Sequence, residues 1–131
     1  MYPVIVLMLL TLFLYIKNYL DNKKAYKNKL VKADYFKIYQ GVVPETIELS
    51  RQTLKNQFEL PVFFYFLVVL LLIFNNITII DLILAWLFVL SRYIHCYIRL
   101  TSNYIPFRAG IFSLGLLFLV GAWINFLANI L

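Results

Sequence analysis

Four long runs of apolar residues, separated by polar segments, constrain this chain more than any other feature of its sequence. The runs are Tyr2–Ile16, Leu60–Phe74, Ile77–Leu90 and Ala109–Leu131. The last is long enough to cross a bilayer alone, and the others reach about 20 residues when polar residues at one end are included. Because 63% of the 131 residues are hydrophobic, a soluble domain could not bury this surface. The sequence therefore predicts an all-α integral membrane protein, a bundle of four transmembrane helices.

We expect these helices at about residues 2–20, 44–74, 79–99 and 107–131, within one domain that covers residues 1–131. The second helix should begin before its apolar run, because Pro44 suits a first helical position. From Pro44 to Phe74 an unbroken helix would be about 46 Å long, which exceeds the ~30 Å of a bilayer core. Pro61 frees the backbone carbonyl of Gln57, which predicts a kink just after a group of polar residues.

The charged residues, 14% of the chain, predict its topology. Most of the basic residues lie in segments 17–43 and 99–108, which the positive-inside rule places in the cytoplasm, with both termini outside. The net charge of +6 is explained by this topology, so we expect no nucleic-acid partner. Segment 17–43 can also contact anionic lipid. The first run has no basic leader and no cleavage site, which favours a retained helix over the alternative of a cleaved signal peptide.

Polar side chains form one stripe on the second predicted helix and another on the third. At about 100° per residue, the stripes hold Glu48, Gln52, Lys55, Asn56 and Glu59 on one helix, and Arg92, His95, Cys96 and Arg99 on the other. A charge inside the membrane costs at least about 2.5 kcal/mol, so such residues normally face a bundle interior or a wet cavity. Two interpretations remain open at this point. The stripes form ion pairs that only hold the bundle together, or they line a polar pocket for an anionic ligand.

A metal site is not expected. His95 and Cys96 are adjacent, so they diverge by about 100° on a helix, and the chain has no second histidine. Cys96 is also the only cysteine, so no disulfide can form within the chain.

Three short motifs at the polar ends of the predicted helices resemble those of the MAPEG family, the membrane-associated proteins of eicosanoid and glutathione metabolism. They are Asn56-x-x-Glu59-x-Pro61, Arg92-x-x-His95 and Pro106-x-Arg108. With the four helices and the long basic first loop, the resemblance covers essentially the whole chain. The stretch NQFELPVFFY, residues 56–65, is similar to the bacterial branch of the family. This branch implies a location in the bacterial cytoplasmic membrane.

The resemblance implies a homotrimer of four-helix protomers, with glutathione as co-substrate bound between neighbouring protomers at the cytoplasmic side. It places Asn56 and Glu59 at glutathione-contacting positions, with Glu59 on the amino group. Arg92 and His95 match polar positions of the pocket. Arg108 matches the arginine that stabilises the glutathione thiolate, a catalytic role that is physically reasonable because a guanidinium lowers the pKa of a nearby thiol.

Two positions depart from the family pattern, and each has a possible substitute beside it. Gln52 stands where the family usually has an arginine, and Arg51 precedes it but is turned about 100° away. Arg99 stands where the family has a tyrosine, and Tyr97 lies two residues earlier. We include all four among the candidate glutathione-binding residues.

The expected activity is that of a glutathione-dependent transferase or peroxidase, whose hydrophobic electrophile or lipid hydroperoxide enters from the membrane lipids. Ala109 and Phe112 replace the serine and tyrosine of prostaglandin-synthase relatives, which argues against that particular activity. Two alternatives belong to other classes. One is a non-catalytic lipid-binding or scaffold protein, and the other is a small transporter that couples to protons through Glu59.

Overall fold

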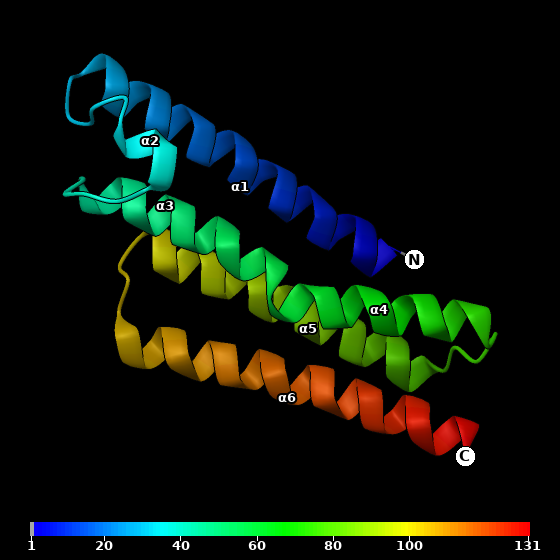
Figure 1. The fold of residues 1–131 in the computed structure, drawn as a ribbon. Coiled ribbons are helices and arrows are strands. Elements are labelled where there is room, and N and C mark those ends of the chain that lie inside the picture. Colours follow the sequence, from blue (N-terminus) through cyan, green and yellow to red (C-terminus); the bar gives the residue numbers. More distant parts are fainter. Residues whose placement is uncertain (1) are drawn as a thin grey trace.

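The computed structural model describes residues 2–131 as helices joined by short connections (Figure 1). The elements are α1 (Tyr2–Lys27), α2 (Tyr35–Ile38), α3 (Glu45–Lys55), the 3-10 turn η1 (Asn56–Phe58), α4 (Leu60–Ile73), α5 (Ile79–Leu100) and α6 (Ile105–Ile130). Within the described residues, four stretches are long and apolar enough to cross a membrane: α1, α3 through α4, α5 and α6. The predicted all-α fold with four membrane-spanning stretches is confirmed.

The first helix is longer than predicted, because α1 continues to Lys27 instead of ending near residue 20. Its second half is rich in lysine, a good helix former, and contains neither glycine nor proline. An ion pair of 2.6 Å between Lys17 Nζ and Asp21 Oδ2 also links successive turns. Lys29 then adopts a left-handed φ of 57°, and the chain turns back. Much of the predicted first loop is therefore helix.

The second spanning stretch is broken at the position where the sequence predicts a kink. α3 ends at Lys55, η1 makes one 3-10 turn, and Glu59 has φ −99° and ψ −97° before α4 begins. Pro61 lies in the first turn of α4, where its missing N–H removes no hydrogen bond within that helix. The interruption is therefore confirmed, and it takes the form of a complete break between two α-helices.

A buried apolar core joins α1, α4, α5 and α6. Phe64 of α4 stacks on Phe88 of α5 with ring centroids 5.0 Å apart. α5 and α6 approach each other closely at Gly115, where an added Cβ would lie 2.5 Å from Ser91 Oγ. Small residues at such contacts let membrane helices pack closely. This packing fixes the rotation of α5 relative to α6, and with it the direction of the polar stripe on α5.

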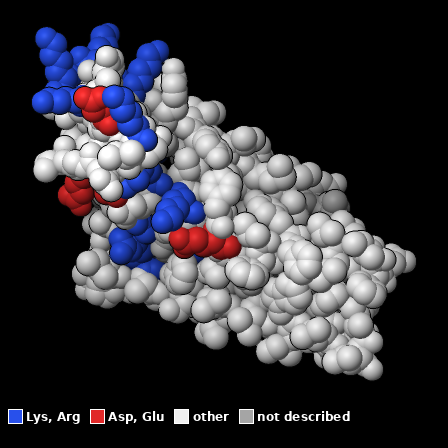
Figure 2. Space-filling model, in the orientation of Figure 1, with Lys and Arg blue, Asp and Glu red and all other residues white. Residues whose placement is uncertain are grey.

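The two basic segments lie at one end of the bundle, here called the basic end. Figure 1 shows the α1–α2 segment and the α5–α6 connection at this end, and both termini with the α4–α5 connection at the opposite end. Figure 2 shows that Lys and Arg side chains gather at the basic end, while most of the visible bundle surface carries no charge. At the opposite end, Thr78 and Asp81 form a capping box on α5, and Asn125 of α6 donates a hydrogen bond to each of them.

Candidate functional site

A polar cavity lies near the basic end, beside the break between α3 and α4. Its volume is about 330 Å³, and its lining residues are Glu48, Arg51, Gln52, Lys55, Asn56, Glu59 and Arg99. Five of the predicted site residues are among them. The cavity exists because helical spacing places the polar side chains of α3 on one side, and because the chain break at η1 extends this side to Glu59.

A chain of hydrogen bonds fixes one wall of the cavity. Glu48 accepts from Arg51 Nη2 at 2.8 Å and 3.0 Å, and it accepts from Gln52 Nε2 at 2.8 Å. At its other end, the Gln52 amide accepts a hydrogen bond of 2.5 Å from Arg99 Nη2. Gln52 therefore links a carboxylate on α3 to a guanidinium on α5. A second arginine at position 52 could not accept this bond, because a guanidinium has no acceptor.

Arg92 lies on α5 two turns before Arg99, farther from the basic end, and it is fully buried, with 0% of its surface exposed. Among the described residues, its Nε, Nη1 and Nη2 atoms have no hydrogen-bond partner. The guanidinium carbon lies 5.4 Å from the ring centroid of Phe112 on α6, and Glu59 is near enough for its charge to act on it. A buried charge without hydrogen bonds costs several kcal/mol (~3–5). The position therefore favours binding of an additional anionic group.

His95 lies between the buried arginines. It is itself buried, its ring centroid lies 5.7 Å from that of Phe112, and its Nδ1 has no partner within residues 2–131. The guanidinium groups of Arg92, Arg99 and Arg108 are all close enough to interact electrostatically with the His95 ring. Four predicted site residues are thus close together, namely Arg92, His95 and Arg99 on α5 and Arg108 on α6. Only Arg99 of these lines the cavity itself.

Arg108 enters this cluster from the first turn of α6. Its Nη1 donates a hydrogen bond to Oδ1 of Asn103, which adopts a left-handed φ of 49° in the connection from α5. Asparagine tolerates this conformation better than most residues. The short loop therefore holds the guanidinium in place and leaves its other nitrogens free of hydrogen bonds to the described residues.

The structure does not bring Tyr97 into the cavity. Its side chain is 71% exposed, and it lines a separate apolar groove of about 460 Å³ between α1 and α5. The reason is helical geometry, since two residues before Arg99 correspond to a rotation of about 200°. By contrast, Arg51 does line the cavity despite its rotation from Gln52, because Glu48 holds its guanidinium there.

The stripe analysis did not identify one buried polar residue, Gln57 of η1. Its Nε2 donates to Cys96 Sγ at 3.2 Å, while its Oε1 has no partner among the residues described. Gln57 lies off the polar stripe of α3, so helical spacing did not identify it. It joins the helix break to α5.

The comparison with protein families agrees with this arrangement. The MAPEG family model matches residues 1–128 of the 131-residue chain. The chain belongs to the MAPEG family. No curated protein and no solved structure shows a significant match. This MAPEG chain is a membrane protein of the family that serves glutathione and eicosanoid metabolism.

The charges of the MAPEG site favour an anionic ligand. Arg51 already neutralises Glu48. Arg92, Arg99 and Arg108, with Lys55 at the cavity wall, then oppose only the Glu59 carboxylate, so these four cations exceed the negative charge by three. Within residues 2–131, no group of three His, Cys, Asp or Glu side chains could hold a metal ion. The arrangement is suited to binding a polar anion that also carries one positive group.

Proposed function

We propose that this protein is a membrane-embedded glutathione-dependent transferase or peroxidase that acts on hydrophobic electrophiles or lipid hydroperoxides. The observation that carries the proposal is the cluster of three arginines and one carboxylate beside the polar cavity. Glutathione has two carboxylates and one ammonium group, and its thiolate form adds another negative charge. Its charges are therefore complementary to those of the cluster, which supports the proposal on chemical grounds.

The polar residues of the cavity are assigned to binding the tripeptide. Glu59 holds the amino group and Asn56 contacts the peptide, in agreement with the matching family positions. Arg99, fixed by Gln52, supplies a guanidinium from α5 where the family usually supplies one from α3. Arg92 and His95 lie deeper, and their buried Arg92 Nε, Nη1 and Nη2 and His95 Nδ1 atoms have no hydrogen-bond partner among the described residues, so they can bind polar groups of the ligand.

Arg108 is assigned to activation of the thiol. The guanidinium favours the thiolate electrostatically, which lowers the pKa of the bound thiol and raises the population of the nucleophile. Bound glutathione supplies a sulfur nucleophile for an electrophilic carbon or a peroxide oxygen. Asn103 keeps Arg108 oriented through one nitrogen, so that the others can face the sulfur.

The same proposal includes an assembly and an orientation. The protein would form a homotrimer with glutathione between neighbouring protomers, in the bacterial cytoplasmic membrane. Segments 17–43 and 99–108 would face the cytoplasm and both termini the outside. The location of both basic segments at one end of the bundle supports this orientation (Figures 1 and 2). The hydrophobic substrate would come from the bilayer.

Glutathione binding to the purified protein is the test of this function. We expect calorimetry to detect binding at millimolar glutathione or below, and ultraviolet absorbance to report thiolate formation in the complex. Arg108→Ala should retain most of the binding but lose the thiolate signal, while Arg108→Lys, which keeps the charge, should retain part of it. Absence of binding would exclude the transferase reading and favour a scaffold role.

A further inference from the structure

The proposed function leaves one strongly charged part of the molecule unused, residues 23–39, here called the lysine cap. It comprises the last turn of α1, the following loop, α2 and Tyr39. Its basic residues are Lys23, Lys24, Lys27, Lys29, Lys32 and Lys37, and its only acidic residue is Asp34. These residues supply five of the six net positive charges of the chain.

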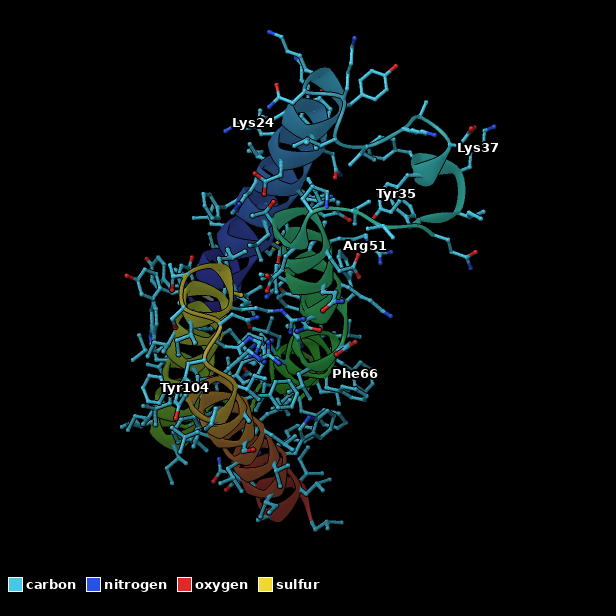
Figure 3. The ribbon with its side chains drawn as sticks, turned by 90° about the vertical axis from the view of Figure 1, so that its left-hand side faces the viewer. Lys24, Tyr35, Lys37, Arg51, Phe66 and Tyr104 are labelled. Carbon is cyan, nitrogen blue, oxygen red and sulfur yellow. The ribbon has the colours of Figure 1, made fainter. Side chains whose placement is uncertain are left out.

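The lysines of the cap are exposed and mostly unpaired, on a backbone that a small core holds in place. Lys37 forms an ion pair of 2.7 Å with Asp34, while the other five form none with the described residues. The cap has its own small core of Ala25, Val31, Tyr35 and Ile47, which attaches it to α3. Figure 3 shows Lys24 on α1 and Lys37 near α2 pointing away from the helices. The charges therefore form a defined surface.

Aromatic and apolar side chains lie among these charges. A groove of about 470 Å³ between α1 and α2 is lined by Tyr19, Asn22, Lys23, Tyr26, Ala33 and Phe36. Leu30, Ile38 and Val42 are exposed nearby. Tyrosine beside lysine is typical of the level of lipid headgroups, where the ring contacts apolar groups and the amine faces phosphate.

The length of α1 places the cap at this level. With 26 residues the helix is about 39 Å long, which exceeds a hydrocarbon core of ~30 Å by about six residues. The excess corresponds to the part of α1 that carries Lys23, Lys24 and Lys27. In Figure 1 the cap lies at the same end of the bundle as the α5–α6 connection, the second basic segment.

We propose that the lysine cap binds the headgroups of anionic phospholipids in the surrounding membrane. Five unpaired amines are complementary to a surface of phosphate groups, and the aromatic groove is complementary to the glycerol and upper acyl region of the same lipids. Each lysine close to an anionic surface strengthens binding about fivefold. This inference is independent of glutathione and requires only that the protein lies in a membrane.

Lipid selectivity of the purified protein tests the proposal. The protein in neutral detergent is titrated with dioleoylphosphatidylglycerol or dioleoylphosphatidylcholine, and bound lipid is counted by mass spectrometry of the intact complexes. We expect the anionic lipid to bind at least ~10-fold more tightly at about 0.15 M salt, and this preference to fall at about 1 M, where the Debye length is only ~3 Å. The combined variant K23Q/K24Q/K27Q/K32Q should lose the preference, since these exposed side chains have no partner in the structure.

The control variant K23R/K24R/K27R/K32R keeps the charges and should keep the preference. Equal binding of the two lipids to the unaltered protein would overturn the proposal, as would a preference that survives the four glutamine substitutions. Competition by free glycerol phosphate at the same concentration would indicate a small phosphate site instead of a lipid surface. Tighter binding of short duplex DNA than of anionic lipid would indicate a nucleic-acid partner and would also overturn it.

Discussion

The buried guanidinium of Arg92 predicts that stability and ligand binding change in opposite directions when this residue is replaced. Arg92 is fully buried, and none of its three nitrogens has a partner among residues 2–131. Replacing buried charges by apolar residues of similar size often stabilises a protein by about 1–4 kcal/mol. Arg92→Met also loses the contact with the Phe112 ring, which can offset up to about 2 kcal/mol. The expected net gain is about 1 kcal/mol, or a rise of roughly 4 °C in the Tm of the ligand-free protein.

Glutathione binding should respond in the opposite way. Loss of a buried charge that pairs with a ligand anion typically costs about 2–5 kcal/mol, which corresponds to at least ~30-fold weaker binding. The assays are thermal unfolding in detergent without ligand and calorimetry with glutathione. Arg92→Lys keeps a buried charge and should give no stabilisation, and Tyr97→Phe, outside the cavity, should change neither quantity. If Arg92→Met lowers the Tm and leaves glutathione affinity unchanged, Arg92 has only a structural role and the argument fails.

Three further predictions concern the cavity and the helix packing that supports it. The double variant Gln52→Arg and Arg99→Tyr should bind glutathione more tightly than either single variant, measured by calorimetry. Arg99→Tyr alone removes the cation, Gln52→Arg alone places two guanidinium groups against each other, and the double variant keeps one cation. Affinities that follow the sum of the single effects would show that the two positions act independently. Glu59→Gln should weaken glutathione about tenfold or more but leave N-acetylglutathione unaffected, and an equal loss for both ligands would contradict the assignment of Glu59 to the amino group. Gly115→Ala should destabilise the protein by about 1–3 kcal/mol, because the new Cβ would lie 2.5 Å from Ser91 Oγ. Ser91→Ala in the same chain should restore part of the lost Tm, and a Gly115→Ala variant with an unchanged Tm would show that α5 and α6 pack less closely.

The fold could be predicted from the sequence because its main determinants are local. Each apolar run is long enough to indicate a membrane helix by itself, and Pro61 marks the break in the second spanning stretch wherever the other helices lie. The length of α1 was underestimated for the opposite reason. Its lysines resemble loop residues in composition, but lysine is compatible with a helix that continues into water.

The candidate site could be predicted only as far as helical periodicity extends. Spacing correctly grouped Gln52, Asn56 and Glu59, which line one cavity. It could not say which face of α5 meets them, since that rotation depends on contacts between helices such as Gly115 against Ser91. Tyr97 was included because it is near Arg99 in sequence, yet it lies on a different side of α5.

The two departures from the family pattern have one joint explanation in the structure. Considered separately, a glutamine in place of an arginine removes a cation from the pocket, and an arginine in place of a tyrosine adds one. Arg99 Nη2 donates directly to Gln52 Oε1, so the two positions are in contact on the same wall of the cavity. In the proposed site, the cation that the family pattern places on α3 is supplied by α5, and Gln52 accepts a hydrogen bond from the Arg99 guanidinium while its own amide group donates to Glu48. The number of cations in the proposed site is thereby unchanged, although the guanidinium comes from α5 instead of α3. The ligand contact that should differ most from that of other family members is therefore the one made by Arg99.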